Sequence, residues 1–217
     1  MEDTPLLDDF ILSRAKGKES RLCFLATASG DSDRMLVNFY TALGARCSAS
    51  HLALFRRTHA DIASYLLKQD IVYVGGGNTA NMLAVWRTHG VDKALARAYE
   101  HGVVLCGVSA GALCWFDCGV TDSFGHLAPL DGLLGLLPGS FCPHYNGDAG
   151  RRPTYHRLIR EGMKAGFAAD VGAALYFANG TLAEVVTSAP NAGAYRVECR
   201  EDITHEEQLE TRYLGNR

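Results

Sequence analysis

The strongest constraint on the fold is a repeated alternation of short apolar runs with segments of helical periodicity. Buried parallel strands read as short apolar runs, and the helices that join such strands pack on the faces of their sheet. The alternation therefore predicts an α/β fold with a mostly parallel sheet and helices on both faces, which gives three layers. The apolar runs are residues 21–28, 51–55, 71–74 and 103–106. The helical segments are residues 31–46, 58–68, 91–100 and 154–165, with one more that Asn78 would cap.

The last third of the chain reads differently. Residues 121–145 are rich in Gly, Pro and Asp, so we expect loops there with one short strand. Strands are predicted at residues 173–177, 183–186 and 195–199. Asn179-Gly180 between the first two is a strong hairpin signal, because a tight hairpin turn needs two residues with positive φ. We therefore expect a β-hairpin toward the C-terminus.

Size and charge narrow the class of protein. A chain of 217 residues fits one domain, here residues 1–217, with residues 1–20 as an N-terminal extension and residues 204–217 as a polar tail. The net charge of −3 does not favour nucleic acid as a partner. Apolar runs are too short for a membrane span, and the acidic N-terminus is unlike a secretory signal.

The cysteines point to a reducing compartment. The chain has seven, an odd number without a CxxC motif, and a secreted protein would favour an even, paired set. We therefore expect a cytoplasmic protein. Cys114 and Cys118 have the spacing to share a helix face, but other ligands are lacking nearby, so two core cysteines are favoured over a metal site. A helix is predicted at residues 112–116.

The motif that carries chemistry is Gly-Val-Ser-Ala-Gly at residues 107–111, directly after an apolar strand and before a predicted helix. In such a G-x-S-x-G turn, the serine projects from the carboxyl edge of the sheet and the flanking glycines let the backbone pass close by. Backbone N–H groups at the start of the following helix can bind an oxyanion. Ser109 is thus a candidate nucleophile, and a serine that merely starts a helix is the alternative.

A serine nucleophile needs a general base and an acid that orients it. His144, in the turn-like segment Phe-Cys-Pro-His-Tyr, is the first candidate base, and His205 is its competitor. Asp122 and Asp170 are the loop aspartates that could orient the histidine, and spacing alone does not choose between them. Ser109, Asp170 and His205 would follow the chain order of an α/β-hydrolase esterase.

A second glycine-rich turn, Gly75-Gly76-Gly77-Asn78-Thr79, follows the strand that precedes the Ser109 strand in sequence. The turn matches neither a dinucleotide-binding fingerprint nor a P-loop, so nucleotide binding is weakly supported. We expect it to supply an N–H donor that faces the nucleophile.

Together these segments resemble the family of serine peptidases that contains peptidase E (aspartyl dipeptidase) and cyanophycinase. The resemblance covers roughly residues 20–180 and rests on the order of several motifs. These are Phe-Leu-Ala-Thr-Ala-Ser-Gly-Asp at residues 24–31, the turns at residues 74–79 and 107–112, Thr-Asp-Ser at residues 121–123, Gly-Leu-Leu-Pro-Gly-Ser-Phe at residues 135–141 and Pro-His-Tyr at residues 143–145.

The resemblance implies a fold like that of the class I glutamine amidotransferases, which is flavodoxin-like, with serine in place of cysteine at the elbow. It implies Ser109 as nucleophile and His144 as base, which makes His205 a poor candidate. It favours Asp170 as the acid and keeps Asp122 as an alternative. Gly76, Gly77 and Ala110 would supply the oxyanion donors. No metal or organic cofactor is required.

The substrate follows from the same resemblance, which suggests dipeptides with N-terminal Asp. A substrate carboxylate calls for a cationic clamp, for which Arg151 and Arg152 are candidates, and Asn78 and Thr79 are further candidate contacts to the peptide. The alternatives are the esterase and a non-catalytic binding module with an amidotransferase-like fold. A homodimer would be common for such a fold, although no stripe in the sequence demonstrates one.

Overall fold

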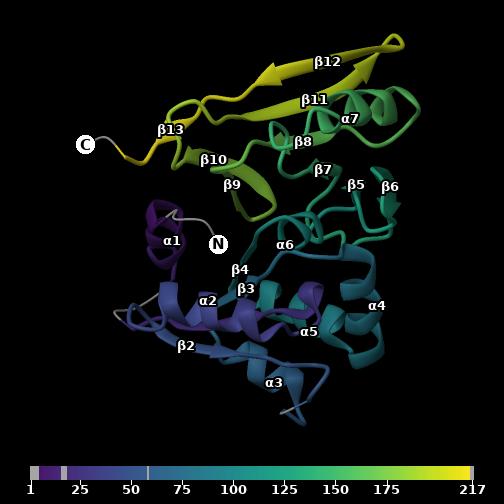
Figure 1. Ribbon diagram of the computed structural model, residues 1–217. Coiled ribbons are helices and arrows are strands. Elements are labelled where there is room, and N and C mark those ends of the chain that lie inside the picture. The colour runs from purple at the N-terminus through teal and green to yellow at the C-terminus, as the bar shows by residue number, and fades with distance from the viewer. Residues whose placement is uncertain (1–4, 16–18, 58, 216–217) are drawn as a thin grey trace. The chain divides into compact units, whose positions relative to one another are not determined.

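The computed structural model describes residues 5–15, 19–57 and 59–215 (Figure 1). They form two compact units, one within residues 1–112 and the other within residues 113–217. In these described stretches, none of the helices combines the length and apolar character that a membrane span requires.

The first unit is organised by a four-stranded parallel sheet with strand order β2-β1-β3-β4. Because the strands are parallel, the loops that follow β1, β3 and β4 all leave from the same edge. In doubly wound sheets with this flavodoxin-like order, ligands bind outside that carboxyl edge, where the strand order reverses. The strands are β1 (Arg21–Leu25), β2 (Ser48–His51), β3 (Ile71–Val74) and β4 (Val104–Gly107).

Helices cover this sheet and bury its apolar side chains. Phe39 on the second helix stacks on Phe24 of β1 with ring centroids 4.7 Å apart, and both rings are fully buried. Ile11 and Leu12, from the N-terminal segment, pack against the same cluster. The helices of the first unit are α1 (Pro5–Leu12), the 3-10 helix η1 (Thr27–Ser29), α2 (Asp33–Leu43), α3 (Ile62–Leu67), α4 (Thr79–His89) and α5 (Val91–Glu100), and α6 (Ala110–Leu113) leads into the second unit.

The second unit contains a six-stranded mixed sheet with order β12-β11-β8-β7-β5-β6 and a three-stranded sheet with order β13-β10-β9. The helix α7 (Arg151–Arg160) packs beside β11 and β12, as Figure 1 shows. Its Tyr155 is fully buried in a cluster with Val120, Tyr145 and Val197. The strands are β5 (Cys118–Thr121), β6 (Ala128–Asp131), β7 (Ser140–Cys142), β8 (Gly166–Ala169), β9 (Ala173–Ala178), β10 (Thr181–Thr187), β11 (Ala194–Arg200), β12 (Ile203–Gln208) and β13 (Arg212–Tyr213).

The predicted α/β class and the predicted C-terminal hairpin are confirmed. Strand β3 and helix α5 occupy the predicted residues, and Asn78 caps α4 by accepting a hydrogen bond from the Asn81 amide. Strands β9 and β10 pair antiparallel. Asn179 and Gly180 between them have φ of 52° and 77°, as a tight hairpin turn requires.

The strand predicted at residues 51–55 is wrong in position. The strand is β2, Ser48–His51, and its last parallel bond runs from the Leu52 amide to the Phe24 carbonyl. Beyond it, the Asp31 carboxylate accepts hydrogen bonds from the Leu54 and Phe55 amides. These bonds turn the apolar segment away from the sheet.

Other predictions in the second half need correction too. The helix predicted at residues 112–116 is α6, which begins at Ala110 and ends at Leu113. Residues 121–145 contain β6 and β7 in addition to the end of β5, rather than one short strand, and the predicted helix at residues 154–165 is shifted to α7. In the segment expected to be a polar tail, residues 204–217, exposed and partly buried residues are mixed among those described, and the first part pairs with β11 as strand β12. Residues 1–4 and 16–18 of the predicted N-terminal extension and residues 216–217 of the predicted tail lie outside the described residues.

Candidate functional site

Ser109 lies on a sharp turn between β4 and α6 in the first unit. Its φ is +54°, a left-handed conformation that is uncommon for a residue other than glycine and persists only where the surroundings enforce it. The Val108 amide donates to the Val74 carbonyl over 3.1 Å, and the Ala112 amide donates to the Ser109 carbonyl over 3.0 Å. The structure therefore gives Ser109 the strand–turn–helix setting of a nucleophile elbow.

The two glycines of the G-x-S-x-G motif are required by close backbone packing. A Cβ atom on Gly107 would lie 2.4 Å from the Gly111 carbonyl oxygen, and one on Gly111 would lie 2.1 Å from the Val74 carbonyl oxygen. Real Cβ contacts are essentially never under 3.0 Å. Both glycines of the motif are therefore needed for backbone packing, in addition to any part that they play in presenting the serine.

The second glycine-rich turn lies directly beside Ser109. A Cβ atom on Gly76 would lie 3.2 Å from the Ser109 Cβ and 3.8 Å from its Oγ. Gly77 has φ +141°, and a Cβ there would meet the Ala28 carbonyl oxygen at 2.2 Å. The Asn78 amide donates to that same oxygen over 2.8 Å. The structure therefore brings Gly76 of the predicted oxyanion turn against the candidate nucleophile.

The remaining predicted residues of the first unit have local roles. Ala110 is buried and begins α6, directly after Ser109. The Asn78 side-chain oxygen accepts from the Asn81 amide over 2.8 Å and so caps α4. Thr79 is the first residue of that helix and is only 2% exposed. Asn78 and Thr79 directly follow the glycine-rich turn whose Gly76 lies beside Ser109.

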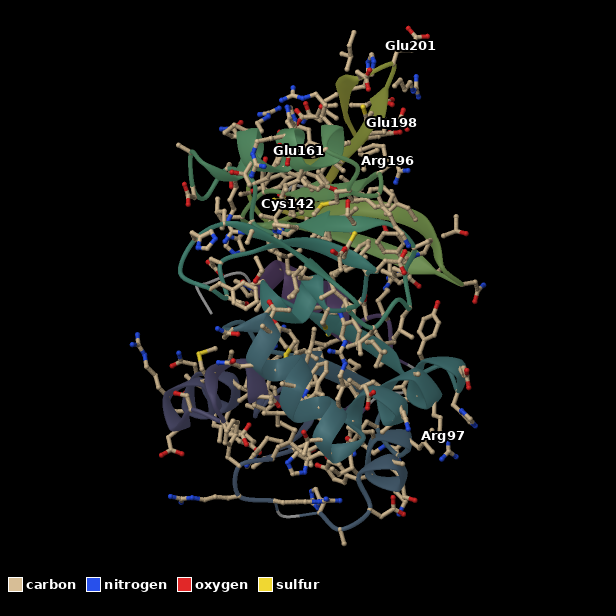
Figure 2. All side chains as sticks on the ribbon, turned by 90° about the vertical axis from the view of Figure 1, so that its right-hand side faces the viewer. Arg97, Cys142, Glu161, Arg196, Glu198 and Glu201 are labelled. Carbon is tan, nitrogen blue, oxygen red and sulfur yellow. The ribbon has the colours of Figure 1, made fainter. Side chains whose placement is uncertain are left out.

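His144 lies in a turn after β7 in the second unit. Cys142, labelled in Figure 2, is fully buried and ends β7 just before Pro143. Like Ser109, His144 has a positive φ, +93°, which is uncommon outside glycine, and its carbonyl accepts from the Gly147 amide over 3.1 Å. The Tyr145 amide donates to the Ala169 carbonyl over 3.0 Å, which ties the turn to the end of β8.

The surroundings lower the pKa of the His144 imidazole. Burial has the largest effect, and the positive charge of Arg151 adds to it, while the charges of Asp122 and Asp148 act in the opposite direction. A histidine with a lowered pKa is neutral at neutral pH, which is the form that can accept a proton from a serine hydroxyl.

Arg151 is an unusual buried cation beside this turn. It is only 3% exposed, and its Nη2 donates to Asp122 Oδ2 over 3.0 Å. Its Nε is buried without a hydrogen-bond partner among the described residues. The Asp122 side chain itself is 61% exposed. The N–H donors of a buried guanidinium are usually all hydrogen-bonded. The Nε donor of Arg151 is an exception, and it could bind an anionic group.

Asp170 is the buried acidic residue near the His144 turn. It is 7% exposed, and its Oδ2 accepts from the Gly193 amide over 3.0 Å and from the Tyr195 hydroxyl over 3.3 Å. Both chain neighbours of Asp170 are bonded to the His144 turn, because the Val171 amide donates to Asn146 Oδ1 over 2.9 Å and the Ala169 carbonyl accepts from Tyr145. The backbone of Asp170 therefore lies beside the His144 turn.

Arg152 and His205 have other surroundings. Arg152 donates to both carboxylate oxygens of Glu206, over 3.2 Å from its Nε, and so has a protein counterion already. His205 is exposed on β12 and pairs with Glu198 in the ladder between β11 and β12. Sequence reasoning missed the partner of Arg152, because Glu206 lies in the segment that was expected to be a polar tail.

The comparison with protein families decides the class of the chain. The sequence profile of peptidase family S51 matches residues 1–185. The chain belongs to peptidase family S51. It is therefore a serine peptidase that acts on peptide substrates. The matched residues include the Ser109, His144, Asp122 and Asp170 segments.

Relatives and solved structures agree with this assignment to family S51. The chain is 48% identical over 215 residues to YgaJ, an uncharacterized peptidase of Bacillus subtilis strain 168, covering 98% of this chain and 93% of that protein. It is 28% identical over 159 residues to Lmo0363, an uncharacterized peptidase of Listeria monocytogenes EGD-e, covering 65% and 72% of the two chains.

Among solved structures, a peptidase from an acI-B1 actinobacterium aligns with a TM-score of 0.72 and 19% identity, over 97% of this chain and 91% of the other. A candidate peptidase E protein of Listeria monocytogenes EGD-e aligns with a TM-score of 0.56 and 19% identity, over 95% of each chain. These likenesses confirm the predicted amidotransferase-like, flavodoxin-like fold. Family S51 membership favours the peptidase over the esterase and the non-catalytic module.

Two further site features concern metals and thiols. In the described stretches, the His, Cys, Asp and Glu side chains form no group of three or more that could hold a metal ion. All seven cysteines carry free thiols, and burial raises the pKa of Cys142 to about 12 and that of Cys114 well above its ordinary value. Thiols with raised pKa values are poor nucleophiles, so the cysteines near the turns do not compete with Ser109.

Proposed function

We propose that the protein is a dipeptidase that works through an acyl-enzyme on Ser109. The observation that carries the proposal is the left-handed turn at Ser109, at the carboxyl edge of a parallel sheet and beside Gly76, in a chain of family S51. A serine in this setting presents its Oγ to a substrate, and adjacent backbone N–H groups can stabilise the oxyanion that develops.

The proposed reaction uses His144 as the general base. Ser109 Oγ attacks the peptide carbonyl carbon while His144 accepts the hydroxyl proton, and amides of the Gly76-Gly77 turn and Ala110 hold the oxyanion. The intermediate collapses, the C–N bond breaks, and His144 gives its proton to the leaving amine. Water then attacks the ester with His144 again as the base. The ester bond breaks, the carboxylic acid product leaves, and His144 returns the proton to Ser109 Oγ.

We propose Asp170 as the acid that orients His144. Its burial supports this role, because a carboxylate in low dielectric interacts more strongly with an imidazolium than an exposed one does. Asp122 remains the alternative, since its charge acts on the His144 pKa. However, it is largely exposed and already paired with Arg151. Asp170→Asn should lower kcat by about 10⁴-fold, as loss of a triad carboxylate does, and Asp122→Asn far less. The reverse order would assign the role to Asp122.

We propose Arg151 as the residue that favours substrates with N-terminal Asp. Arg151 donates to Asp122 through Nη2, but its buried, unpartnered Nε supports the binding of a substrate carboxylate, whereas Arg152 donates to both carboxylate oxygens of Glu206. Asn78 and Thr79 stay candidates for contacts to the peptide backbone.

The experiment is hydrolysis of a dipeptide panel that varies the first residue, with Ser109→Ala as the inactive control. Cleavage of Asp-Leu well ahead of Ala-Leu, Lys-Leu and Leu-Leu is expected. Arg151→Met should remove that preference while some cleavage of Ala-Leu survives. If no dipeptide is cleaved but longer peptides are, the dipeptidase proposal is wrong. If Leu-Leu is preferred, the Asp preference is wrong.

A further inference from the structure

Glu206 is a nearly buried carboxylate outside the segment that the family profile matches. It lies on β12, beyond the residues 1–185 matched by family S51, and its side chain is 13% exposed. It accepts hydrogen bonds from the Tyr145 hydroxyl over 2.6 Å, from His156 Nε2 over 2.7 Å and from Arg152. Burial raises the pKa of Glu206, but the hydrogen bonds from Arg152, Tyr145 and His156 outweigh it and hold the pKa below its usual value.

The contact with Tyr145 connects Glu206 to the His144 turn. Tyr145 directly follows His144 in sequence but is separated from Glu206 by 61 residues. Tyr145 is 3% exposed, and its ring packs edge-on against Tyr155. A non-glycine residue with a positive φ, such as His144, keeps its conformation only where its neighbours are fixed. The charge-assisted bond to Glu206 fixes the neighbour on the C-terminal side.

A second line of contacts leads from Glu206 toward Asp170. The guanidinium of Arg152, which donates to Glu206, lies over the rings of both Tyr145 and Tyr195, at 5.3 Å and 5.1 Å from their centroids. The Tyr195 hydroxyl in turn donates to Asp170 Oδ2. One largely buried carboxylate thus anchors a group of side chains that reaches both the His144 turn and the proposed acid.

We propose that Glu206 is a positioning residue that holds the His144 turn in its reactive conformation through the Tyr145 hydroxyl. This inference rests on the proposed function, because it takes His144 as the base. It also assigns Arg152 to the partnership with Glu206 rather than to the substrate. The C-terminal hairpin β11–β12, whose residues Glu198 and Glu201 are labelled in Figure 2, then contributes to catalysis from outside the family's matched segment.

The test is a double-mutant cycle on Tyr145→Phe and Glu206→Ala. Tyr145→Phe removes the hydroxyl but keeps the buried ring, so the fold should survive. Glu207→Ala is the matched control, because Glu207 is exposed on the same strand. Two measurements are made on each variant. Steady-state hydrolysis of a cleaved dipeptide gives kcat and KM, and the rate of labelling by a small fluorophosphonate reports the reactivity of Ser109 itself. Circular dichroism and a thermal melt show that each variant is folded at the assay temperature.

Each single variant should lower kcat and the labelling rate by about tenfold, the size of one charge-assisted hydrogen bond, with KM changed by less than about twofold. The double variant should lose no more than either single variant, because both remove the same contact. Glu207→Ala should match the unmodified enzyme.

Unchanged kcat and labelling in folded Tyr145→Phe, a loss confined to KM, or losses that multiply in the double variant would each overturn the proposal. If Glu206→Ala does not fold, Glu206→Gln takes its place in the cycle. Its amide oxygen still accepts from Tyr145, so its loss should lie between those of the unmodified enzyme and Tyr145→Phe. His144→Ala separates the two proposals: if that variant keeps full activity, the proposed function fails, whereas its inactivity leaves the test of Glu206 intact.

Discussion

Gly76→Ala tests whether the second glycine-rich turn faces the reacting atoms. The added methyl would lie 3.2 Å from Ser109 Cβ and 3.8 Å from Ser109 Oγ, where 3.4–4 Å is ordinary contact. Ser109 must therefore move by a few tenths of an ångström, and the methyl fills space beside Oγ. Overpacking of this kind costs about 1–3 kcal/mol of stability. Misplacement of a reacting group, or loss of one oxyanion donor, costs about 10²-fold or more in kcat.

We therefore expect Gly76→Ala to fold and to lose about a hundredfold in kcat toward a cleaved dipeptide. Gly162→Ala is the control. Gly162 also has a positive φ, +106°, but a Cβ atom there would have no other atom within 4 Å, so the added methyl displaces nothing. That variant should lose about 1 kcal/mol or more of stability through backbone strain and keep its kcat. The assay is steady-state hydrolysis combined with urea unfolding of both variants. A folded Gly76→Ala enzyme with unchanged kcat would refute the placement of this turn at the active site.

Two more predictions concern stability and pH. Ser140→Ala removes the partner of the buried Tyr155 hydroxyl, which lies 2.7 Å from Ser140 Oγ, so the free energy of unfolding in urea should fall by about 1–3 kcal/mol. Adding Tyr155→Phe to that variant should recover part of the lost stability, because the unpaired hydroxyl is then gone. Losses of stability that add in the double variant would contradict the pairing. Burial and Arg151 lower the pKa of His144, and the base must be neutral, so kcat/KM should rise with pH through a pKa below the ordinary histidine value. Arg151→Met removes one of the lowering charges, so the acid limb of the kcat/KM profile should move to higher pH, and a shift to lower pH would show that the reasoning has the wrong sign.

The sequence predicts the first unit well because each signal there is local. Strand β3 is a short apolar run that stops at three glycines, and its bounds match the prediction. The G-x-S-x-G motif predicts a turn, and Ser109 has the positive φ that such a turn needs. The edge strand β2 fails, because its residues are polar and pair on one side only, while the apolar residues that follow are diverted by hydrogen bonds to Asp31.

The second unit is predicted less well because its structure depends on contacts between distant residues. Strand β12 has polar residues on both faces, so no periodicity marks it, and it forms by pairing with β11. The contact between Tyr145 and Glu206 has no local signature either, since it joins residues from separate elements. The candidate residues Ser109 and His144 follow from motifs, whereas the side chains that we propose to position His144 follow only from the fold.

The most direct test of the account is to find which atom a small fluorophosphonate modifies in the folded protein. Intact mass and peptide mapping should show one adduct, on Ser109, formed in parallel with the loss of dipeptide hydrolysis. His144→Ala should slow the labelling by several orders of magnitude, because the hydroxyl is a weak nucleophile without a base. An enzyme that stays fully active with Ser109 replaced by Ala, or that is inactivated by an adduct on another residue, would contradict the central claim.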